Sequence, residues 1–205
     1  MTSRPEILTI GHSTHDVEQF LALLAQHCVT AIADVRSQPF SRYSPQYNRS
    51  ALSASLKRHG IRYVFLGEAL GARSTDPDCY VDGRVQYERL ARSEAFEAGV
   101  TRVLNGAQHE RISLMCTEKE PLDCHRTVLV ARHLEARGAS VSHIHADGST
   151  ESHDQAMDRL LQQLGMQASL LCSRDAQIEE ALTKQESRIA YVDPDLQASS
   201  TTAVP

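Results

Sequence analysis

The sequence predicts an α/β fold, in which helices cover both faces of a mostly parallel sheet. Short apolar runs alternate along the chain with longer stretches whose apolar residues recur at helical spacing. Polar or charged residues directly follow most of the apolar runs, as expected where parallel strands end at one edge of a sheet. The alternation favours right-handed crossovers and a three-layer, Rossmann-like arrangement with about five strands.

The first predicted strand covers residues 7–10 and runs into a Gly-His-Ser-Thr segment at 11–14. A helix with one apolar stripe follows from Asp16. A strand, a glycine and small polar residues before a helix can present backbone amides to an anion, which makes His12 and Ser13 candidate substrate-binding residues. Because there is only one glycine, an ordinary strand–helix corner with a capping serine or threonine is the alternative.

The second predicted strand, residues 29–35, carries Asp34 near its end, and Arg36 and Ser37 follow. A carboxylate at the end of a buried strand costs stability unless it has a partner or a function. We therefore take Asp34 as a candidate catalytic residue, with Arg36 and Ser37 as candidates for substrate binding. The alternative is that Asp34 only pairs with Arg36 or caps the loop.

Residues 35–67 form the most basic part of the chain, with six cations and no acid before Glu68. Tyr43 and Tyr47 are interleaved with the cations, and a helix is predicted from residue 48 to Gly60. A basic loop with aromatic residues favours a local site for phosphate, nucleotide or single-stranded nucleic acid, so Arg42 and Tyr43 become substrate-binding candidates. The alternative is a solvated face whose arginines pair with acids elsewhere.

A third strand is predicted at residues 61–66, and Glu68 at its end is a further substrate-binding candidate. A loop rich in glycine, aspartate and proline then extends to residue 83. Loops of this length are often lids or binding loops. The next helix is predicted over residues 87–104, where apolar residues again recur at helical spacing.

The central strand is predicted at residues 112–115, and a thiol and an acid, Cys116 and Glu118, lie on the loop that leaves it. Pro121 prevents the strand from continuing, and Asp123 is the predicted N-cap of a helix that ends at Gly138. The first turn of this helix contains a second thiol, an imidazole and a guanidinium, at Cys124, His125 and Arg126. In an α/β sheet, this strand-to-helix corner is where ligands bind.

The remaining chain predicts a fifth strand at 140–145, a turn at Asp147-Gly148 and a helix through residue 164 that Ser149 or Thr150 caps. Another amphipathic segment covers residues 166–190. We expect a core domain over residues 1–165, a helical extension over 166–192 that packs on the core, and a disordered tail over 193–205.

Composition limits the class of protein. With 205 residues, of which 41% are apolar, the chain is long enough for one domain with a sizeable core. A net charge of −5 excludes a protein that binds nucleic acid over its whole surface. Five cysteines without framework spacing indicate a reducing compartment. The N-terminus has no apolar secretory core and no long apolar run occurs, so we expect a soluble, cytoplasmic protein without membrane attachment. The oligomeric state and any cofactor are unknown at this point.

Five segments of the chain form a specific set when taken together: TIGHS (9–13), ADVRSQPFSRYSPQYN (33–48), IRYVFLGEALGA (61–72), CTEKEPLDCHR (116–126) and HIHADGS (143–149). In these segments the chain resembles the domain of unknown function 488 family. The resemblance implies an α/β fold and a shared polar site, but no established reaction. The polar positions that mark the family carry over to this chain as Asp34, Arg36, Ser37, Glu118, Cys124, His125 and Arg126.

One interpretation of these residues is a thiol-dependent enzyme. The helix dipole and the neighbouring cations favour the thiolate form of Cys124. Glu118 can act as an acid or a base, and Arg36 and Arg126 can hold an anionic substrate. The alternative for Cys124 is a small, unreactive buried residue.

A second interpretation is a metal site. Cys116, Cys124 and His125 are ligand types that suit zinc or iron, and His12 or a carboxylate can complete the set. Their Cys-x7-Cys-His spacing differs from the usual structural zinc patterns. A third interpretation is a module that binds a nucleotide or nucleic acid through residues 36–49 without catalysis.

Of these interpretations, the enzyme is our first expectation. It would act on a nucleotide or nucleic-acid-like phosphorylated substrate through Cys124, His125 and Glu118, with Asp34 as a further catalytic candidate. A phosphorylated small molecule or a nucleic acid is therefore the expected partner.

Overall fold

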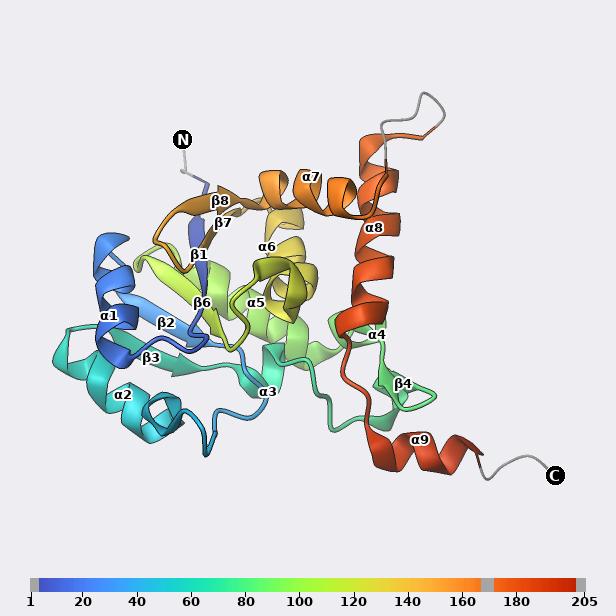
Figure 1. The fold of residues 1–205 in the computed structure, drawn as a ribbon, viewed down its shortest axis with the longest axis horizontal. Helices are drawn as coiled ribbons and strands as arrows, with labels where there is room; N and C mark the ends of the chain where they lie inside the picture. The colour runs from blue at the N-terminus through green and yellow to red at the C-terminus, as the bar shows by residue number, and fades with distance from the viewer. Residues whose placement is uncertain (1–3, 167–171, 202–205) are drawn as a thin grey trace.

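The structure, a computed structural model, describes residues 4–166 and 172–201. Its centre is a six-stranded sheet in the order β3-β2-β6-β1-β7-β8 (Figure 1). The strands of this sheet are β1 (Glu6–Gly11), β2 (Ala31–Asp34), β3 (Arg62–Phe65), β6 (Ile112–Cys116), β7 (Ser140–Ile144) and β8 (Thr150–Ser152). All pairs from β3 to β7 are parallel, which confirms the predicted mostly parallel sheet.

Within this six-stranded sheet, β8 is the strand that the sequence did not predict, and it pairs antiparallel with β7. The predicted turn at Asp147-Gly148 is present, with Gly148 at a φ of +84°. The predicted cap at Ser149 or Thr150 is wrong, because helix α7 (His153–Gln163) begins only after Ser152. The Ser152 hydroxyl accepts the Gln155 N–H while the Gln155 side chain accepts the Ser152 N–H, a reciprocal cap that fixes the start of the helix.

Helices cover both faces of the sheet, as predicted (Figure 1). α1 (Val17–Gln26) and α2 (Arg49–Arg58) pack on one face, where they bury alternate residues of the strands such as Leu8, Ile10 and Ile32. The opposite face is covered by a second group of helices, namely α4 (Tyr87–Ala91), α5 (Glu94–Gly106), α6 (Arg132–Ala136), α7 and α8 (Arg174–Ile189).

The connection between β3 and β6 is more structured than the sequence predicts. The loop expected after β3 contains α3 (Gly67–Leu70), a 3₁₀ turn η2 (Pro77–Cys79) and a hairpin of β4 (Tyr80–Val81) and β5 (Arg84–Val85). The single helix expected over residues 87–104 is divided into α4 and α5. The Ser93 hydroxyl accepts the Phe96 N–H at 3.2 Å and so caps the start of α5.

The C-terminal segment packs on the core through α8, which buries Ala181 and Leu182. Part of the segment that was expected to be disordered forms a helix, α9 (Pro194–Thr201). Asp193 stabilises its start, because the Asp193 carboxylate accepts the Asp195 N–H at 3.0 Å. Residues 167–171 and 202–205 of the predicted extension and tail lie outside the described residues. Within the described part of the chain, no helix is both long enough and apolar enough to cross a membrane.

The order of the strands creates one preferred place for a site. The helices that follow β1 and β2 lie on one face, whereas α5 and α6, which precede and follow the β6 segment, lie on the other. β6 lies between β1 and β2, and the connection that leaves its carboxyl end goes to one face of the sheet, whereas the connections that leave β1 and β2 go to the other. Ligands of open α/β sheets bind in the crevice at such a switch point.

Candidate functional site

The loops after β1, β2 and β6 lie side by side because hydrogen bonding continues beyond the strands. The His12 N–H donates to the Cys116 carbonyl at 2.9 Å, and the Val35 N–H donates to the Met115 carbonyl at 3.1 Å. The loop that leaves β6 is therefore held between the other two loops. This arrangement brings residues from distant parts of the sequence together, as the strand-end positions predict.

Gly11 allows the loops after β1 and β6 to approach each other. A Cβ atom at this position would lie only 1.8 Å from the Glu118 carbonyl oxygen and 3.2 Å from Arg126 Nη2. No side chain fits into that space, so the glycine in the first strand–helix corner serves close backbone approach. The signal that suggested an anion loop in the sequence is thus explained at Gly11 by packing.

Asp34 is fully buried and lies behind the site rather than in it. Arg36 binds it through two bonds, from Nε to Oδ1 at 2.9 Å and from Nη2 to Oδ2 at 2.7 Å. The Tyr63 hydroxyl donates to Oδ2 at 2.7 Å. The structure therefore shows the pairing of Asp34 with Arg36 that the sequence left as its alternative, and a catalytic role of Asp34 stays a prediction. Tyr63, which sequence reasoning missed, is the second side chain that binds the carboxylate, through a hydrogen bond.

His12 and Tyr47 complete the support of Arg36. The ring of His12 stacks on Tyr47 at a centroid distance of 4.0 Å, and its Nε2 atom accepts Arg36 Nη1 at 3.3 Å. Arg36 Nη2 also donates to the Tyr47 carbonyl at 2.9 Å. Burial and the positive charge of Arg36 lower the pKa of His12 to about 4, so the ring is neutral near pH 7. With respect to the described residues, one N–H on Arg36 Nη1 remains for a ligand.

The turn before the next helix differs from the prediction. Residues 121–123 form a 3₁₀ turn, η3 (Pro121–Asp123), which Glu120 caps, so the predicted N-cap at Asp123 is wrong. Pro121 starts this turn because its fixed φ suits a first helical position. The helix begins after Cys124 as a π-helix, η4 (Arg126–Ala131), and continues as α6.

Cys124 occupies the start of this helix with an extended backbone. Its carbonyl accepts the N–H groups of Thr127 and Val128 at 3.0 and 3.2 Å, and its Sγ atom accepts the Arg126 N–H at 3.5 Å. The thiol therefore lies where the unpaired N–H groups of a helix favour negative charge. This confirms the sequence-based position of Cys124 at a helix start, although not within the first turn.

Cys116, Cys124 and His125 form a compact buried cluster. The two Sγ atoms each lie 3.8 Å from His125 Nδ1, and the three potential ligand atoms lie within 4.8 Å of one another. The other ring nitrogen, Nε2, faces the Val35 carbonyl at 3.0 Å and must carry a proton. Nδ1 then faces the two sulfur atoms, either with a lone pair or, in the imidazolium form, with a second N–H.

Glu118 and Arg126 place opposite charges beside the cluster. Glu118 belongs to an exposed loop, but its Oε2 atom lies 3.0 Å from Cys124 Sγ. Arg126 is fully buried, and its guanidinium donates to the Glu118 and Lys119 carbonyl oxygens at 2.7 and 3.3 Å. Among the described residues, no carboxylate forms an ion pair with Arg126, and its Nε atom has no hydrogen-bond partner. A buried cation of this kind favours a nearby anion.

The pKa shifts of these groups fit an anionic Cys124. Burial alone raises the pKa of the Cys124 thiol, but the hydrogen bond from Cys116 and the charges of Arg126 and His125 lower it well below its usual value. The hydrogen bond to Cys124 and burial raise the pKa of Cys116 well above its usual value. Burial and the charge of Cys124 raise the pKa of Glu118. Burial disfavours the His125 imidazolium, yet the bond to Cys124 and its charge raise the pKa of His125.

A cavity of about 300 Å³ opens in front of the cluster. Its polar wall contains six of the thirteen predicted site residues, namely Arg36, Ser37, Cys116, Glu118, Cys124 and His125. Three aromatic residues also line the cavity, namely Phe40, Tyr87 and Tyr191. The sequence analysis did not assign any of them to the site. The cavity is therefore polar on the side of the thiols and partly aromatic on the other sides.

Arg73 is a further residue of this cavity that sequence reasoning missed. Its guanidinium lies over the Tyr191 ring at 4.4 Å, and its Nη1 atom donates to the Gln38 side chain at 3.3 Å. Its backbone N–H donates to the Ser37 hydroxyl at 3.0 Å, which fixes the loop. No described carboxylate pairs with Arg73. The only signal for Arg73 in the sequence was its position in a long glycine-rich loop after a strand.

The sequence matches the family described as Domain of unknown function DUF488 over residues 16–133, more than half of the chain. The chain belongs to this family. The DUF488 match includes Arg36, Arg73 and the whole cluster around Cys124, whereas Tyr191 of the cavity wall lies beyond it. No curated protein and no solved structure matches the chain.

Seven residues that the sequence placed in the site are absent from the wall of this DUF488 cavity, within the described chain. Four of them are Ser13, Arg42, Tyr43 and Glu68. Arg42 and Tyr43 are exposed on the loop between β2 and α2, and Glu68 is exposed on α3. Ser13 adopts a φ of +49° in the loop after β1. Asp34, His12 and Arg126 lie directly behind the wall, where they contact the residues that form it.

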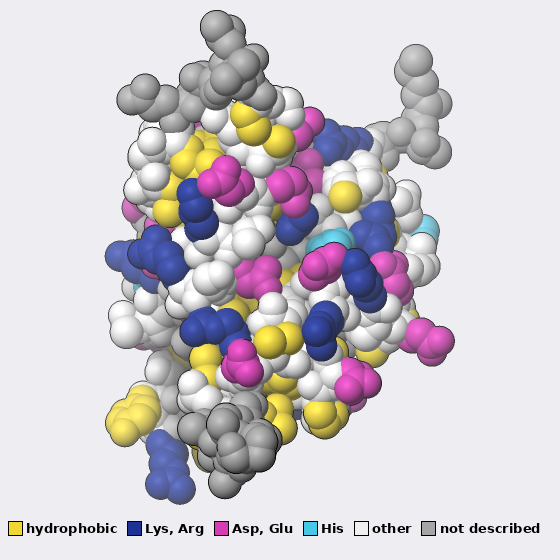
Figure 2. Space-filling model, turned by 90° about the vertical axis from the view of Figure 1, so that its right-hand side faces the viewer, with side chains coloured by type: hydrophobic (Ala, Val, Ile, Leu, Met, Phe, Trp, Pro, Cys, Tyr) yellow, Lys and Arg dark blue, Asp and Glu magenta, His cyan; other side chains and the backbone are white. Residues whose placement is uncertain are grey.

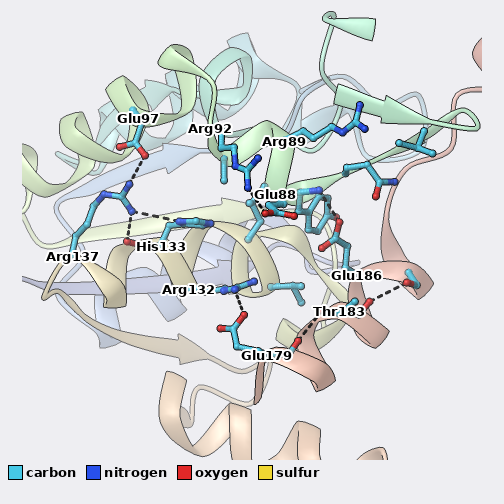
Figure 3. A pocket seen from close by; sticks show the side chains of 17 residues that line it. Glu88, Arg89, Arg92, Glu97, Arg132, His133, Arg137, Glu179, Thr183 and Glu186 are labelled. Carbon is cyan, nitrogen blue, oxygen red and sulfur yellow. Dashed lines mark hydrogen bonds and ion pairs between the residues drawn. The ribbon is translucent and has the colours of Figure 1, made fainter. Parts of the chain in front are cut away.

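A larger cavity of about 760 Å³ lies elsewhere on the domain, between α4, α5, α6 and α8 (Figure 3). Three of its four arginines form ion pairs with glutamates of the same cavity, through Arg92–Glu88, Arg132–Glu179 and Arg137–Glu97. Figure 2 shows the same mixture of both signs over this face of the molecule. Because most of its charges are paired and no cysteine lines it, we place the candidate site of this DUF488 protein at the smaller cavity.

Proposed function

We propose that this protein is a thiol-dependent enzyme that acts on a phosphorylated, nucleotide-like substrate, with Cys124 as the nucleophile. One observation carries the proposal: Cys124 Sγ lies at a helix start, 3.0 Å from a carboxylate oxygen of Glu118, on the wall of an open cavity. A thiolate, not a thiol, is the attacking group, and a helix start beside a buried arginine favours the thiolate.

Each neighbour of Cys124 has a distinct role in this proposal. Glu118 gives a proton to the leaving group and takes one from the attacking water, because its carboxylate lies 3.0 Å from the reacting Cys124 sulfur. His125 is oriented by the Val35 carbonyl and faces Cys124 with Nδ1. Arg126 supplies the positive charge that balances the thiolate. Cys116 positions Cys124 rather than reacting, since its own pKa is raised.

The cavity wall opposite Cys124 supports an anionic substrate. Arg73 has no acidic partner among the described residues. Its guanidinium stacks on the Tyr191 ring, which restricts the orientation of its N–H groups. Arginine in this setting binds phosphate oxygens through paired hydrogen bonds. The ring of Phe40 lines the same cavity and is exposed enough to stack on a flat substrate.

The proposed reaction has two steps. The Cys124 thiolate attacks the phosphorus atom of a phosphate ester, a sulfur–phosphorus bond forms, and the leaving alkoxide takes the proton of the Glu118 carboxylic acid. Water then attacks phosphorus, Glu118 takes one proton from this water, and the sulfur–phosphorus bond breaks to return the thiolate. The net reaction consumes one water and releases one alcohol and one phosphate, so no further reactant is needed.

The test combines turnover with trapping of the intermediate. We expect hydrolysis of at least one member of a panel of nucleoside 5′- and 3′-phosphates and p-nitrophenyl phosphate, and a mass increase of one phosphoryl group on Cys124 after rapid acid quench. Cys124→Ser should lower turnover by at least about a thousandfold, since catalysis by an activated nucleophile is lost. Cys28→Ser, at an exposed cysteine, is the matched control. Full turnover by Cys124→Ser would refute the proposal.

A second candidate function is a metal centre, and the geometry of the sulfur and nitrogen atoms favours it. In a tetrahedral zinc site, a sulfur and a nitrogen ligand lie about 3.6 Å apart. Both Sγ–Nδ1 distances in the cluster are 3.8 Å, and the bond from Nε2 to the Val35 carbonyl is the outer contact that metal-bound histidines make. Glu118 is the fourth potential ligand and faces the cavity.

Metal analysis separates the two candidates. Protein purified without a tag and without chelator should contain less than 0.1 equivalents of zinc or iron, on the order expected for a site that holds none. About one equivalent of metal per chain would favour the metal centre over the thiol enzyme, provided that Cys116→Ser and Cys124→Ser both lose the metal and Cys79→Ser keeps it. Cys79 is the appropriate control because it is buried but lies outside the cluster.

A further inference from the structure

Two aromatic rings stand exposed on the loop between β2 and α2. Phe40 is 71% exposed and Tyr43 is 98% exposed. The loop itself is ordered by side-chain bonds: the Asn48 side chain accepts the Ser41 N–H at 2.7 Å, and the Ser41 hydroxyl accepts the Tyr43 N–H at 3.1 Å. A fixed turn therefore presents both rings to solvent. Binding residues are found disproportionately on loops that a rigid scaffold positions, so two exposed rings on this ordered loop are candidates for a contact surface.

The same part of the chain carries exposed cations that form no ion pair with a described acid. These are Arg42 on the loop and Arg49, Lys57 and Arg58 on α2. The two remaining cations of residues 35–67 are paired, Arg36 with Asp34 and Arg62 with Glu110. In a protein with a net charge of −5, this is a local reversal of sign. The face in Figure 2 carries charges of both signs, whereas residues 42–58 carry cations only. This difference indicates an anionic partner for the surface around residues 42–58.

This surface is continuous with the candidate site. A surface cavity of about 730 Å³ lies beside β3 and is lined by Phe40, Arg49, Tyr63 and Phe65 among others. Phe40 also lines the cavity in front of Cys124, so one ring forms the boundary between the two. The Arg49 guanidinium lies over the Phe65 ring at 4.4 Å, and both residues line the surface cavity.

We propose that Phe40, Arg42, Tyr43 and Arg49, called here the basic aromatic surface, bind single-stranded nucleic acid and lead one nucleotide of it into the cavity at Cys124. Unpaired bases stack on exposed rings while cations follow the phosphates. A duplex cannot use the rings in this way, because its bases are already stacked and paired. An acidic protein would use the cations but has no need of two solvated rings. Delivery to Cys124 rests on the proposed function, whereas binding does not.

The test is fluorescence anisotropy with a fluorescein-labelled twelve-nucleotide single strand, as mixed-sequence DNA and as RNA, in 20 to 200 mM salt. We expect saturable binding to the single strand, and at least tenfold weaker binding to the duplex of the same sequence and to poly-glutamate. Tyr43→Ala should weaken single-strand binding about tenfold, and Phe40→Ala by a similar factor, because one stacking ring is lost. Arg42→Ala should reduce the slope of log affinity against log salt by about 0.7.

Matched controls use residues outside the surface. Arg102→Ala removes an exposed cation on α5 and should leave affinity and salt slope unchanged. Circular dichroism of each variant establishes that the fold is intact. No binding at 20 mM salt, equal binding to duplex or poly-glutamate, or unchanged affinity of both ring variants would each overturn the proposal. A preference for RNA over DNA, or the reverse, identifies the natural strand and supports it.

The two proposals fail in distinguishable ways. Cys124→Ser should bind the single strand as tightly as the native protein, because Cys124 is buried and outside the basic aromatic surface. If this variant keeps both binding and turnover, the thiol function is refuted and the binding surface stands. If neither Tyr43→Ala nor Phe40→Ala loses binding or turnover on oligonucleotides while Cys124→Ser loses turnover, the surface is refuted and the thiol function stands.

Discussion

Cys124 Sγ lies 3.0 Å from Glu118 Oε2, a separation at which the two groups share a single proton. If both were ionised, two negative charges would meet beside a buried cluster, which costs stability. The shifts of both groups resolve this conflict in one direction, because the pKa of Cys124 is lowered and that of Glu118 is raised. Both shifts favour the form in which the sulfur carries the negative charge and the carboxyl group the proton, which is the form suited to attack by a thiolate.

The first prediction concerns the reactivity of the two buried thiols. In a Cys28→Ser/Cys172→Ser background, iodoacetamide should modify Cys124 at pH 7 at least tenfold faster than Cys116, because only the thiolate reacts. The lowered pKa of Cys124 keeps it ionised as the pH falls below the usual range of a thiol, whereas the raised pKa of Cys116 keeps it protonated. Mass spectrometry of the modified peptides measures the two rates between pH 5 and 9.

A charge variant checks the cause of this selectivity. Arg126→Met should move the pH profile of Cys124 alkylation to higher pH, because the positive charge that lowers its pKa is lost. Arg126→Lys keeps the charge and should move the profile less. Equal rates at Cys116 and Cys124, or an unchanged profile in Arg126→Met, would contradict the assignment of Cys124 as the anionic thiol.

The second prediction concerns the buried pair of Asp34 and Arg36. Asp34→Asn should lower the free energy of unfolding by about 3–5 kcal/mol, because it leaves the guanidinium buried without its counter-charge. Tyr63→Phe removes one hydrogen bond to Asp34 and should cost about 1–2 kcal/mol. Urea unfolding followed by circular dichroism measures both losses.

A double variant completes this test. Asp34→Leu/Arg36→Met removes both charges and should be less destabilising than the sum of the two single changes, because no buried charge is left without a partner. An additive loss would mean that the two residues do not act as a pair. The distinction matters for the site, since Arg36 lines the cavity and Asp34 holds it in place.

These buried partners show how far the sequence leads. The largely apolar runs at residues 7–10 and 112–115 predict the central strands correctly, because strands buried on both faces are almost continuously apolar. Polar residues just beyond them predict the site, because parallel strands end at a common edge. The sequence could not decide whether Asp34 serves catalysis or pairs with Arg36, since a sequence does not show that Tyr63 reaches the same carboxylate.

Other features depend on contacts between distant segments and left no readable signal. β8 has three residues, which is too short for any periodicity. Tyr191 joins the cavity from a segment that follows the last core helix, and its position is set by the packing of α8. Arg73 becomes a site residue only because Tyr191 lies beneath it. Tertiary packing therefore decides these assignments rather than local pattern.

The third prediction tests the close approach of two loops at Gly11. Gly11→Ala should lower the free energy of unfolding by about 2–3 kcal/mol or more, because the added methyl group meets the Glu118 carbonyl at 1.8 Å and backbone must move. It should also change the alkylation rate of Cys124, since the displaced loop carries Glu118. Gly106→Ala is the control: its methyl group meets only the end of the flexible Ile112 side chain, at 2.9 Å. Equal stability of both variants would exclude the steric requirement.

The fourth prediction concerns buried histidines and acid. The His143 Nε2 and His153 Nδ1 atoms lie 3.2 Å apart, and Thr9 Oγ1 lies 2.9 Å from His143 Nδ1, so both rings are held in a buried chain. Burial lowers the pKa of His153 to about 4 and lowers the pKa of His143 well below its usual value. The unfolded chain binds a proton at each ring below about pH 6.5, whereas the folded chain does not.

The free energy of unfolding therefore falls as the pH drops from about 6.5 toward 4, by about 1.4 kcal/mol per pH unit for each histidine. Above about pH 6.5 the contribution of the two histidines is fully present. His153→Asn keeps a hydrogen-bond acceptor toward His143 but cannot take up a proton, so the slope of unfolding free energy between pH 6 and 4.5 should decrease by about that amount. His109→Asn, at an exposed ring, should leave the slope unchanged. Urea unfolding at half-unit steps of pH measures the slopes, and an identical slope in native protein and His153→Asn would show that the ring is already protonated in the fold.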